Sequence, residues 1–430
     1  MKNVLPFAAT PTLLASASIL LLSGCAIVPR FWARAPGDHA LIAHWPAPEG
    51  STKLRLAIKD NIDIKGYVTS AGSQNLARNE PPATRDAPCL AIARQRGVHF
   101  VGKANLSEFA VAPSGINEYF GTPENPLSGW RKLIPGGSSS GSAVVVASGM
   151  ADVAFGTDTA GSVRVPAACC GIVGLKTTFG LISIKGVHPI EPTHLDTVGP
   201  MAKDIAGTAQ GMDLLQSGFA ARYASARAAK PAGSNIRVGR LRLKGTDPKI
   251  DKALDQALAL AGFQVIELSD DFRTKWESAK SDGNTVAAAG AWISDKQYQF
   301  SFGIAPRTKS AILAGQLAYN NGYRSALARR DEWQAALRGV FRKVDFIALP
   351  TIQSAPPAIP PNFKIGVIEA LVLKFQNTVP ANFAGNPALA MPIPIKHFGV
   401  PVTSLQLIGP PRSEAELLNA GRLVELAVRK

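Results

Sequence analysis

The 430-residue chain has few of the residues that build metal sites and disulfide frameworks. It contains only 4 cysteines and 6 histidines, and the histidines show no metal-ligand spacing. We therefore expect no bound metal and no disulfide framework, and we interpret Cys89, Cys169 and Cys170 as small buried residues. Charged residues make up only 18% of the chain and hydrophobic residues 46%, which excludes a disordered protein and predicts a large core.

Acidic residues are also scarce, since 31 Asp and Glu stand against 46 Lys and Arg and give a net charge of +15. Such a charge could serve a nucleic-acid partner. The sequence has no basic run, no basic motif interleaved with aromatic residues and no zinc or RNA-binding signature. We therefore expect no nucleic-acid partner, and we interpret the positive charge as suited to an anionic membrane or a cell-wall polymer.

The N-terminus carries a pattern typical of export. Lys2 precedes an apolar stretch over 13–22, which is too short to span a bilayer, and Leu-Ser-Gly-Cys follows at 22–25. This tetrapeptide resembles the lipobox of bacterial lipoproteins, which implies cleavage before Cys25 and lipidation of its sulfur; a secretory signal with a chance cysteine is the alternative. We predict an exported lipoprotein anchored on the periplasmic face of a membrane, with the outer membrane favoured.

The domain organisation predicted from this pattern has three parts. Residues 1–24 are a signal peptide, and residues 25–50, which are rich in proline, are the lipidated cysteine and a tether. Residues 51–430 form a single domain.

Beyond the tether, strand-like and helix-like segments alternate. Residues 54–59 show an alternating strand pattern, and residues 142–150 form a small-residue helix pattern. Residues 235–243, 248–261 and 263–268 predict strand, helix and strand in turn. This alternation predicts an α/β protein with helices packed on a sheet.

Two clusters of glycine and serine flank the helix pattern, GGSSSGS at 136–142 and GTDTAGS at 156–162. Glycine allows backbone N–H groups to approach a ligand closely, and serine hydroxyls can act as nucleophiles or carry protons. The two clusters together are typical of a site that holds an oxyanion beside a serine.

The run over 135–166 resembles the amidase signature family, whose pattern is GGSS[SG]G followed by GT[DE]xxGS[IV]RxP in this order and at this spacing. The resemblance is strong over roughly 40–210. It returns in three shorter segments: 345–352, 377–392 and 401–409. It implies an α/β fold, a mixed twisted β-sheet sandwiched between helical layers.

The resemblance also implies a mechanism without histidine. Ser162 corresponds to the nucleophile, Ser138 to a proton relay that follows a cis peptide bond, and Lys59, in the sequence Lys-Asp-Asn, to the base. A lysine ordinarily has a pKa of about 10.4, so the base must be buried to accept a proton near neutral pH. We interpret the competing lysines Lys103 and Lys176 as structural.

The resemblance assigns the oxyanion hole to backbone N–H groups around the nucleophile. These belong to four consecutive residues: Thr159, Ala160, Gly161 and Ser162. Most members of the family have glycine at the position of Ala160, so we expect strain in the loop if that position requires a positive φ. Asp158 and Arg164 are expected to pair and brace the loop.

A different serine site is the alternative. Residues 137–141 fit GxSxG, the nucleophile elbow of the α/β-hydrolases, and a triad could include His188 or His194 with Asp196. The elbow requires a strand that leads directly into it, and a proline followed by two glycines is a poor strand.

The sequence thus predicts a cofactor-free serine amidase that hydrolyses the C–N bond of a small-molecule or peptide carboxamide through an acyl-enzyme on Ser162. Aliphatic, aryl and peptide amides all fit the sequence, as does any oligomeric state. One alternative is a catalytically silent lipoprotein of the same fold that binds amides or peptides, favoured by Ala160 and by Thr177, where most members have proline. The other is the glutaminase component of a tRNA-dependent amidotransferase, against which the export pattern argues.

Overall fold

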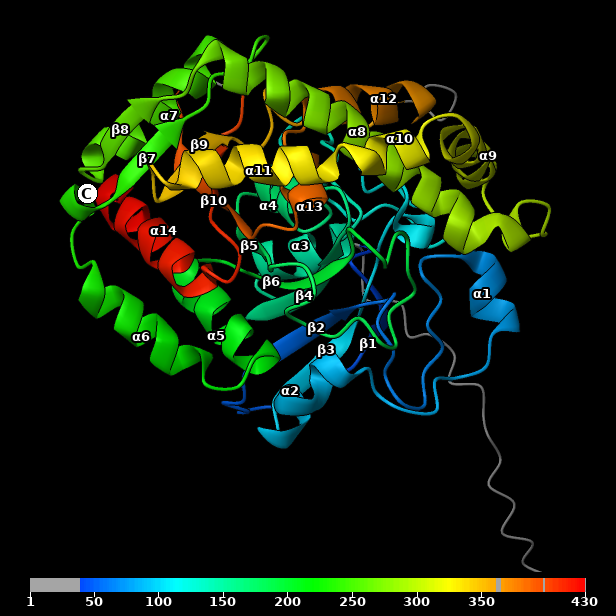
Figure 1. Cartoon of the computed structure of the whole chain (residues 1–430). Coiled ribbons are helices and arrows are strands. Elements are labelled where there is room, and N and C mark those ends of the chain that lie inside the picture. Colours follow the sequence, from blue (N-terminus) through cyan, green and yellow to red (C-terminus); the bar gives the residue numbers. More distant parts are fainter. Residues whose placement is uncertain (1–38, 361–364, 397–398, 430) are drawn as a thin grey trace, which may run out of the picture. The chain divides into compact units, whose positions relative to one another are not determined.

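The computed structural model describes residues 39–360, 365–396 and 399–429, so Cys25 and the predicted signal peptide over 1–24 lie outside the described residues. The described residues contain eleven strands that form one sheet (Figure 1). In chain order they are β1 (Leu41–His44), β2 (Arg55–Lys59), β3 (His99–Ala104), β4 (Val153–Asp158), β5 (Val173–Lys176), β6 (Thr197–Ala202), β7 (Arg237–Arg240), β8 (Gln264–Glu267), β9 (Phe346–Pro350), β10 (Ala388–Pro394) and β11 (Val402–Ile408).

The sheet is mixed, with the strand order β1-β3-β2-β4-β6-β5-β10-β11-β9-β7-β8. β2 runs parallel to both β3 and β4, and β7 runs parallel to both β8 and β9. The remaining neighbours are antiparallel. Parallel neighbours require a crossover connection, and helices supply these crossovers on both faces.

The helices with α geometry are α1 (Gln74–Asn79), α2 (Ala91–Gln95), α3 (Ser140–Ala147), α4 (Arg164–Cys170), α5 (Ile205–Leu215), α6 (Phe219–Ala229), α7 (Pro248–Leu260), α8 (Asp270–Asp295), α9 (Pro306–Asn321), α10 (Tyr323–Ala328), α11 (Arg330–Phe341), α12 (Ile365–Phe375), α13 (Val379–Ala384) and α14 (Glu414–Val428).

The two faces of the sheet are covered by different helices because the side chains of a strand alternate between faces. Leu56 and Ile58 of β2 pack into a core with α5, α6, α7 and α14, whereas Ala57 between them packs with α3 and α4. At the other end of the sheet, α8, α11 and α13 cover β9 and β11. The predicted fold, a mixed twisted sheet sandwiched between helical layers, is confirmed (Figure 1).

The individual elements agree with the patterns that predicted them. The strand pattern over 54–59 forms β2, and the pattern over 235–268 forms β7, α7 and β8. The helix expected over 142–150 is α3, which begins at Ser140 and ends at Ala147.

The predicted tether over 25–50 needs a correction at its C-terminal end. Leu41–His44 form β1, which pairs antiparallel with β3 at the edge of the sheet, and residues 40–43 are buried. The fold therefore begins by residue 41, ten residues before the predicted domain start. Prolines at 36, 46 and 48 flank this short apolar strand, and because proline is typical of linkers the whole segment was interpreted as a tether.

The sheet brings the two glycine-serine clusters together. β2 ends at Lys59 and its parallel neighbour β4 ends at Asp158, so both carboxyl ends lie on the same edge of the sheet. The second cluster leads from β4 into α4, and the first leads into α3, which packs beside α4.

In the described part of the chain, no helix combines the length and the apolar character that crossing a bilayer requires.

Candidate active site

Lys59, the last residue of β2, points its ammonium group into the interior beside the first serine cluster. Its side chain is fully buried, and Nζ lies 2.7 Å from Ser138 Oγ and 2.7 Å from Thr157 Oγ1. Burial lowers the pKa of Lys59 from 10.5 to about 7, although the nearby carboxylates of Asp158 and Asp196 oppose this shift. A substantial share of Lys59 is therefore neutral near pH 7.

Ser138 is held in a tightly packed loop that precedes α3. The peptide bond between Gly137 and Ser138 is cis. A Cβ atom on Gly137 would lie 2.6 Å from the Gly115 nitrogen and 2.7 Å from the Ala112 oxygen. Glycine at position 137 therefore lets the loop press against residues 112–115, which holds the buried hydroxyl of Ser138 beside Lys59.

Ser162 lies in the loop between β4 and α4. It is partly buried and lines a cavity of about 670 Å³ together with Gly137. The carbonyl oxygen of Ser162 accepts a hydrogen bond of 3.2 Å from the Ser139 nitrogen, which ties the two clusters to each other. The structure thus joins Lys59 and Ser138 directly and places Ser162 at the adjoining cavity.

The oxyanion hole predicted over 159–162 needs one correction. The N–H of Gly161 donates to Asp158 Oδ1 at 2.8 Å, because Gly161 turns back toward the end of β4 with a φ of 133°. Its N–H group is therefore occupied within the protein. The backbone N–H groups that remain candidates belong to three residues that line the cavity: Thr159, Ala160 and Ser162.

Ala160 does not strain the loop. The residues other than glycine that have a positive φ in the described chain do not include Ala160, so alanine fits its backbone conformation. The carbonyl oxygen of Ala160 accepts a hydrogen bond from Thr378 Oγ1, which fixes the turn from the opposite side. The strain expected from this departure from the family pattern is therefore absent.

Asp158 and Arg164 form a buried, two-point ion pair at the base of the loop. Arg164 Nη2 and Nε lie 2.9 and 3.0 Å from the two carboxylate oxygens, and both side chains are fully buried. Burial alone would raise the pKa of Asp158, but the Arg164 guanidinium holds it at about 2. Arg164 Nη1 also donates to the Thr378 oxygen and to Gln406 Oε1, which connects the loop to β11.

Asp196 also supports the loop and does not belong to a histidine triad. Its Oδ1 accepts from Thr159 Oγ1 at 2.7 Å, and burial raises its pKa. His188 bonds to Asp295, and His194 bonds to Glu191. The structure therefore gives both histidines partners outside the serine clusters, which argues against the triad.

The competing lysines have structural partners. Lys103 Nζ forms a buried ion pair of 2.7 Å with Asp60 Oδ1. Lys176 Nζ donates to the backbone oxygens of Thr177 and Asn386, and burial lowers its pKa to about 7.

Three cysteines are free and buried, as expected from the composition: Cys89, Cys169 and Cys170.

Thr157 and Asn61 were not predicted as parts of the site. Thr157 Oγ1 accepts a hydrogen bond from Lys59 and another, of 3.1 Å, from Asn61 Nδ2. Both residues belong to the motifs that point to the site, Gly-Thr-Asp and Lys-Asp-Asn. Their position in these motifs could therefore have indicated a role in the site.

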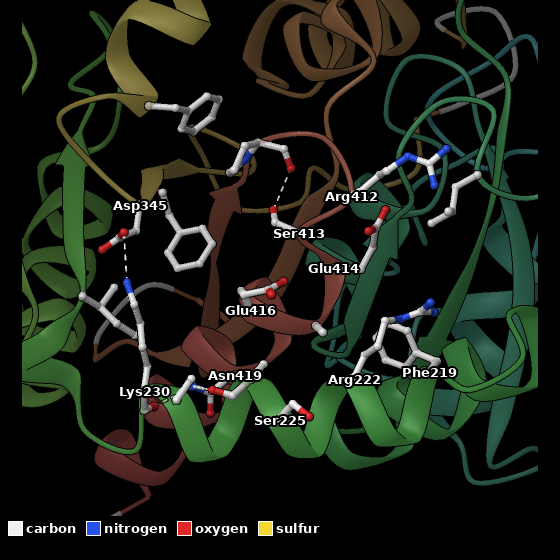
Figure 2. Close-up of a pocket in the computed structure, with 18 of the residues that line it drawn as sticks. Phe219, Arg222, Ser225, Lys230, Asp345, Arg412, Ser413, Glu414, Glu416 and Asn419 are labelled. Carbon is white, nitrogen blue, oxygen red and sulfur yellow. Dashed lines mark hydrogen bonds and ion pairs between the residues drawn. The ribbon is translucent and has the colours of Figure 1, made fainter.

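A second cavity, of about 880 Å³, lies between α6 and α14 and is not lined by the serines of the two clusters or by Lys59. Figure 2 shows its mixed charge, with Lys230 paired to Asp345 on one side and Arg222, Arg412 and Glu416 on the others. The smaller cavity at Ser162 is therefore the candidate active site.

Within the described residues, no group of three or more His, Cys, Asp or Glu side chains is arranged to hold a metal ion.

The chain belongs to the amidase family, because the family model named Amidase matches residues 54–418. A glutamyl-tRNA(Gln) amidotransferase subunit of Halobacterium salinarum is 32% identical over 410 residues, which cover 86% of this chain and 94% of the relative. The 2-amino-5-chloromuconic acid deaminase of Comamonas testosteroni is 32% identical over 404 residues, with 87% and 81% covered.

The fold is also similar to solved structures. The corresponding glutamyl-tRNA(Gln) amidotransferase subunit from Thermotoga maritima superposes with a TM-score of 0.74 at 27% identity, covering 90% of this chain and 87% of the other. The chain is therefore an amidase-family protein over most of its length, with the fold of that family.

The predicted location is contradicted by these relatives. A relative that matches most of the chain is named for a glutamyl-tRNA, which is an intracellular molecule, whereas the N-terminal pattern predicted a lipoprotein anchored to an outer membrane. That prediction depended on residues 13–25, which lie outside the described residues. An apolar stretch of ten residues that ends near a cysteine is too short a pattern to fix a location by itself.

Proposed function

We propose that this protein is a serine amidase that hydrolyses a carboxamide to a carboxylic acid and ammonia or an amine. The observation that carries the proposal is the hydrogen bond of 2.7 Å between the buried Lys59 amine and Ser138, beside the cavity lined by Ser162. Membership of the amidase family supports the same chemistry.

The proposed reaction begins with the neutral form of Lys59. Ser138 gives its proton to Lys59 Nζ and takes the proton of Ser162 Oγ, while Ser162 Oγ attacks the amide carbon. The tetrahedral oxyanion is stabilised by backbone N–H groups of the remaining candidates: Thr159, Ala160 and Ser162.

The proton then returns along the same path to the amide nitrogen, and the C–N bond breaks. Ammonia or an amine leaves, and the acyl group stays on Ser162 as an ester. Water, deprotonated through the same pair of Ser138 and Lys59, hydrolyses that ester and restores the serine. Every proton removed is returned, so the cycle needs no cofactor.

The proposal can be tested without knowing the substrate. The full chain is treated with a fluorophosphonate, and the modified peptide is identified by mass spectrometry. We expect an adduct on Ser162 that is lost in Ser162→Ala and is formed at least a hundredfold more slowly in Lys59→Ala. An adduct on Ser139, or none on a folded protein, would contradict the assignment; the second result would favour the silent binding protein.

A second candidate function is supported by the relatives named as glutamyl-tRNA(Gln) amidotransferase subunits. In that case the protein would release ammonia from glutamine for a transfer reaction carried out with other subunits. The argument from export against this candidate no longer holds, because the predicted location is wrong. Ammonia release from glutamine, compared with release from simple carboxamides by the same preparation, distinguishes the two candidates.

A further inference from the structure

We propose that the cavity at Ser162 selects carboxamides whose body is uncharged and apolar, and discriminates against amides that carry a free charge, glutamine among them. This inference rests on the proposed amidase function and adds the substrate class. It depends on two features of the described cavity lining: the small apolar side chains of its wall and the pairing of its charged groups.

One wall of the cavity is formed by α8 and α9, which contribute six alanines to its lining. These are Ala287, Ala288 and Ala291 on α8, and Ala311, Ala314 and Ala318 on α9. Small side chains leave the volume of about 670 Å³ open, and they offer a substrate only apolar contact.

The wall is also firmly built. A Cβ atom on Gly315 of α9 would lie 2.5 Å from the Ala288 oxygen and 3.0 Å from the Trp292 nitrogen of α8. Glycine at this position therefore lets the two helices pack with backbones almost in contact. We infer that the alanine surface is a fixed part of the cavity.

Only two of the described residues that line the cavity are charged, Arg307 and Glu369, and they neutralise each other. Arg307 Nη1 lies 2.6 Å from Glu369 Oε1, and the two side chains are only 12% and 13% exposed. Glu369 also accepts hydrogen bonds from the nitrogen and hydroxyl of Ser114, and Arg307 Nη2 donates to the Ile116 oxygen. Arg307 Nη2 also lies 3.3 Å from Glu118 Oε2, and only Nε of the guanidinium has no hydrogen-bond partner. The charge of Arg307 is thus compensated by two carboxylates of the protein.

This arrangement disfavours a free amino acid. Glutamine carries an ammonium and a carboxylate next to each other, and a charge that leaves water needs a partner in the protein. The remaining polar lining on α8 and α9 consists of uncharged side chains: Ser281, Asn284, Thr285, Thr308 and Ser310. In contrast, each methylene that an apolar substrate buries is expected to improve binding about fourfold.

The test uses ammonia release by the full chain from hexanamide, phenylacetamide, glutamine and succinamic acid, at pH 8. We expect kcat/KM for hexanamide and phenylacetamide to exceed that for glutamine and succinamic acid at least tenfold. Fluorophosphonate labelling of Ser162 is measured on the same preparation. Labelled enzyme that prefers glutamine or succinamic acid would overturn this inference and leave the amidase function standing, whereas absence of labelling would overturn the amidase function itself.

A variant pair tests the wall directly. Ala314→Phe fills part of the cavity, and we expect it to lower kcat/KM for phenylacetamide at least tenfold while acetamide, which is small, changes less than threefold. Leu313→Phe is the matched control, because Leu313 is the preceding residue of the helix, is 49% exposed and does not line the cavity. Equal losses in both variants, with unchanged thermal stability, would contradict the assigned wall.

Discussion

Thr157 Oγ1 lies 2.7 Å from Lys59 Nζ, on the same amine that contacts Ser138. A neutral lysine has two N–H groups and one lone pair. The hydroxyl and carbonyl oxygens of Thr157, at 2.7 and 3.5 Å, can accept both N–H groups. The lone pair is then directed to the hydroxyl proton of Ser138, which is the orientation that a base requires.

We therefore predict that Thr157 positions the base. Thr157→Val keeps the shape of the side chain and removes the acceptor, so kcat/KM should fall about tenfold, the effect of losing one hydrogen bond to an amine. A hydrogen bond accepted from an ammonium favours the charged lysine, so its loss should also move the acid limb of the pH profile to lower pH. Thr157→Ser, which keeps the hydroxyl, should restore both values; a Val variant with an unchanged pH profile would contradict the role.

The lowered pKa of Lys59 predicts how activity depends on pH. The base works only when neutral, and its pKa of about 7 lies well below 10.5, so kcat/KM should rise tenfold per pH unit below 7 and level off above it. A pH series of kcat/KM measures this midpoint.

Lys176 provides the control for this profile, since burial also lowers its pKa to about 7. Lys176→Met should leave the midpoint in place, whatever it does to stability. A midpoint that disappears in this variant would show that Lys176, and not Lys59, controls the acid limb.

The buried ion pair of Asp158 and Arg164 should be important for stability. Asp158→Asn leaves the fully buried Arg164 without its charge partner, and we expect the free energy of unfolding to fall by about 3–5 kcal/mol in urea denaturation. The matched control is Asp152→Asn, which breaks the pair with Arg55; both of these side chains are at least a third exposed, so the loss should be under about 1 kcal/mol. Similar losses in the two variants would be evidence against a special role for the buried pair.

Two neighbouring positions in the loop of Ser162 should differ in their tolerance of substitution. Gly161 has a φ of 133°, and an added Cβ would collide with Thr378 Oγ1, so Gly161→Ala should lower kcat about a hundredfold or more through displacement of Ser162. Ala160→Gly should change kcat less than threefold, because Ala160 has no positive φ. Steady-state kinetics of both variants provides the check, and a tolerated Gly161→Ala would show that the loop adapts.

Much of the fold was predictable because the signals were local. Alternation in the strand that ends at Lys59, and the glycines around Ser138 and Ser162, express constraints carried by a few adjacent residues. β1 fell within the predicted tether because a four-residue strand between prolines has too little pattern of its own. The predicted location failed for a related reason, since it depended on one short motif near Cys25.

Apart from Thr157 and Asn61, the unpredicted features of the site depend on long-range contacts or on the exact backbone conformation of the loop. Thr378 and Gln406 reach the loop from positions 214 and 242 residues beyond Arg164. They lie in the segments over 377–392 and 401–409 where the resemblance returns, but no spacing in the sequence connects them to Arg164. The hydrogen bond from Gly161 to Asp158 depends on the exact turn of the loop, so the assignment of its N–H to the oxyanion hole could be corrected only from the structure.

The close approach of α8 and α9 at Gly315 has a consequence for how such a protein could diverge. The sheet and its loops carry the proposed reacting groups, whereas a separate segment of the chain, over 270–321, supplies about half of the residues that line the cavity. Single exchanges of alanine along one side of α9 could therefore alter which molecules are accepted while the chemistry stays intact. Selection could act on the two parts independently, and substrate range could drift without an inactive intermediate.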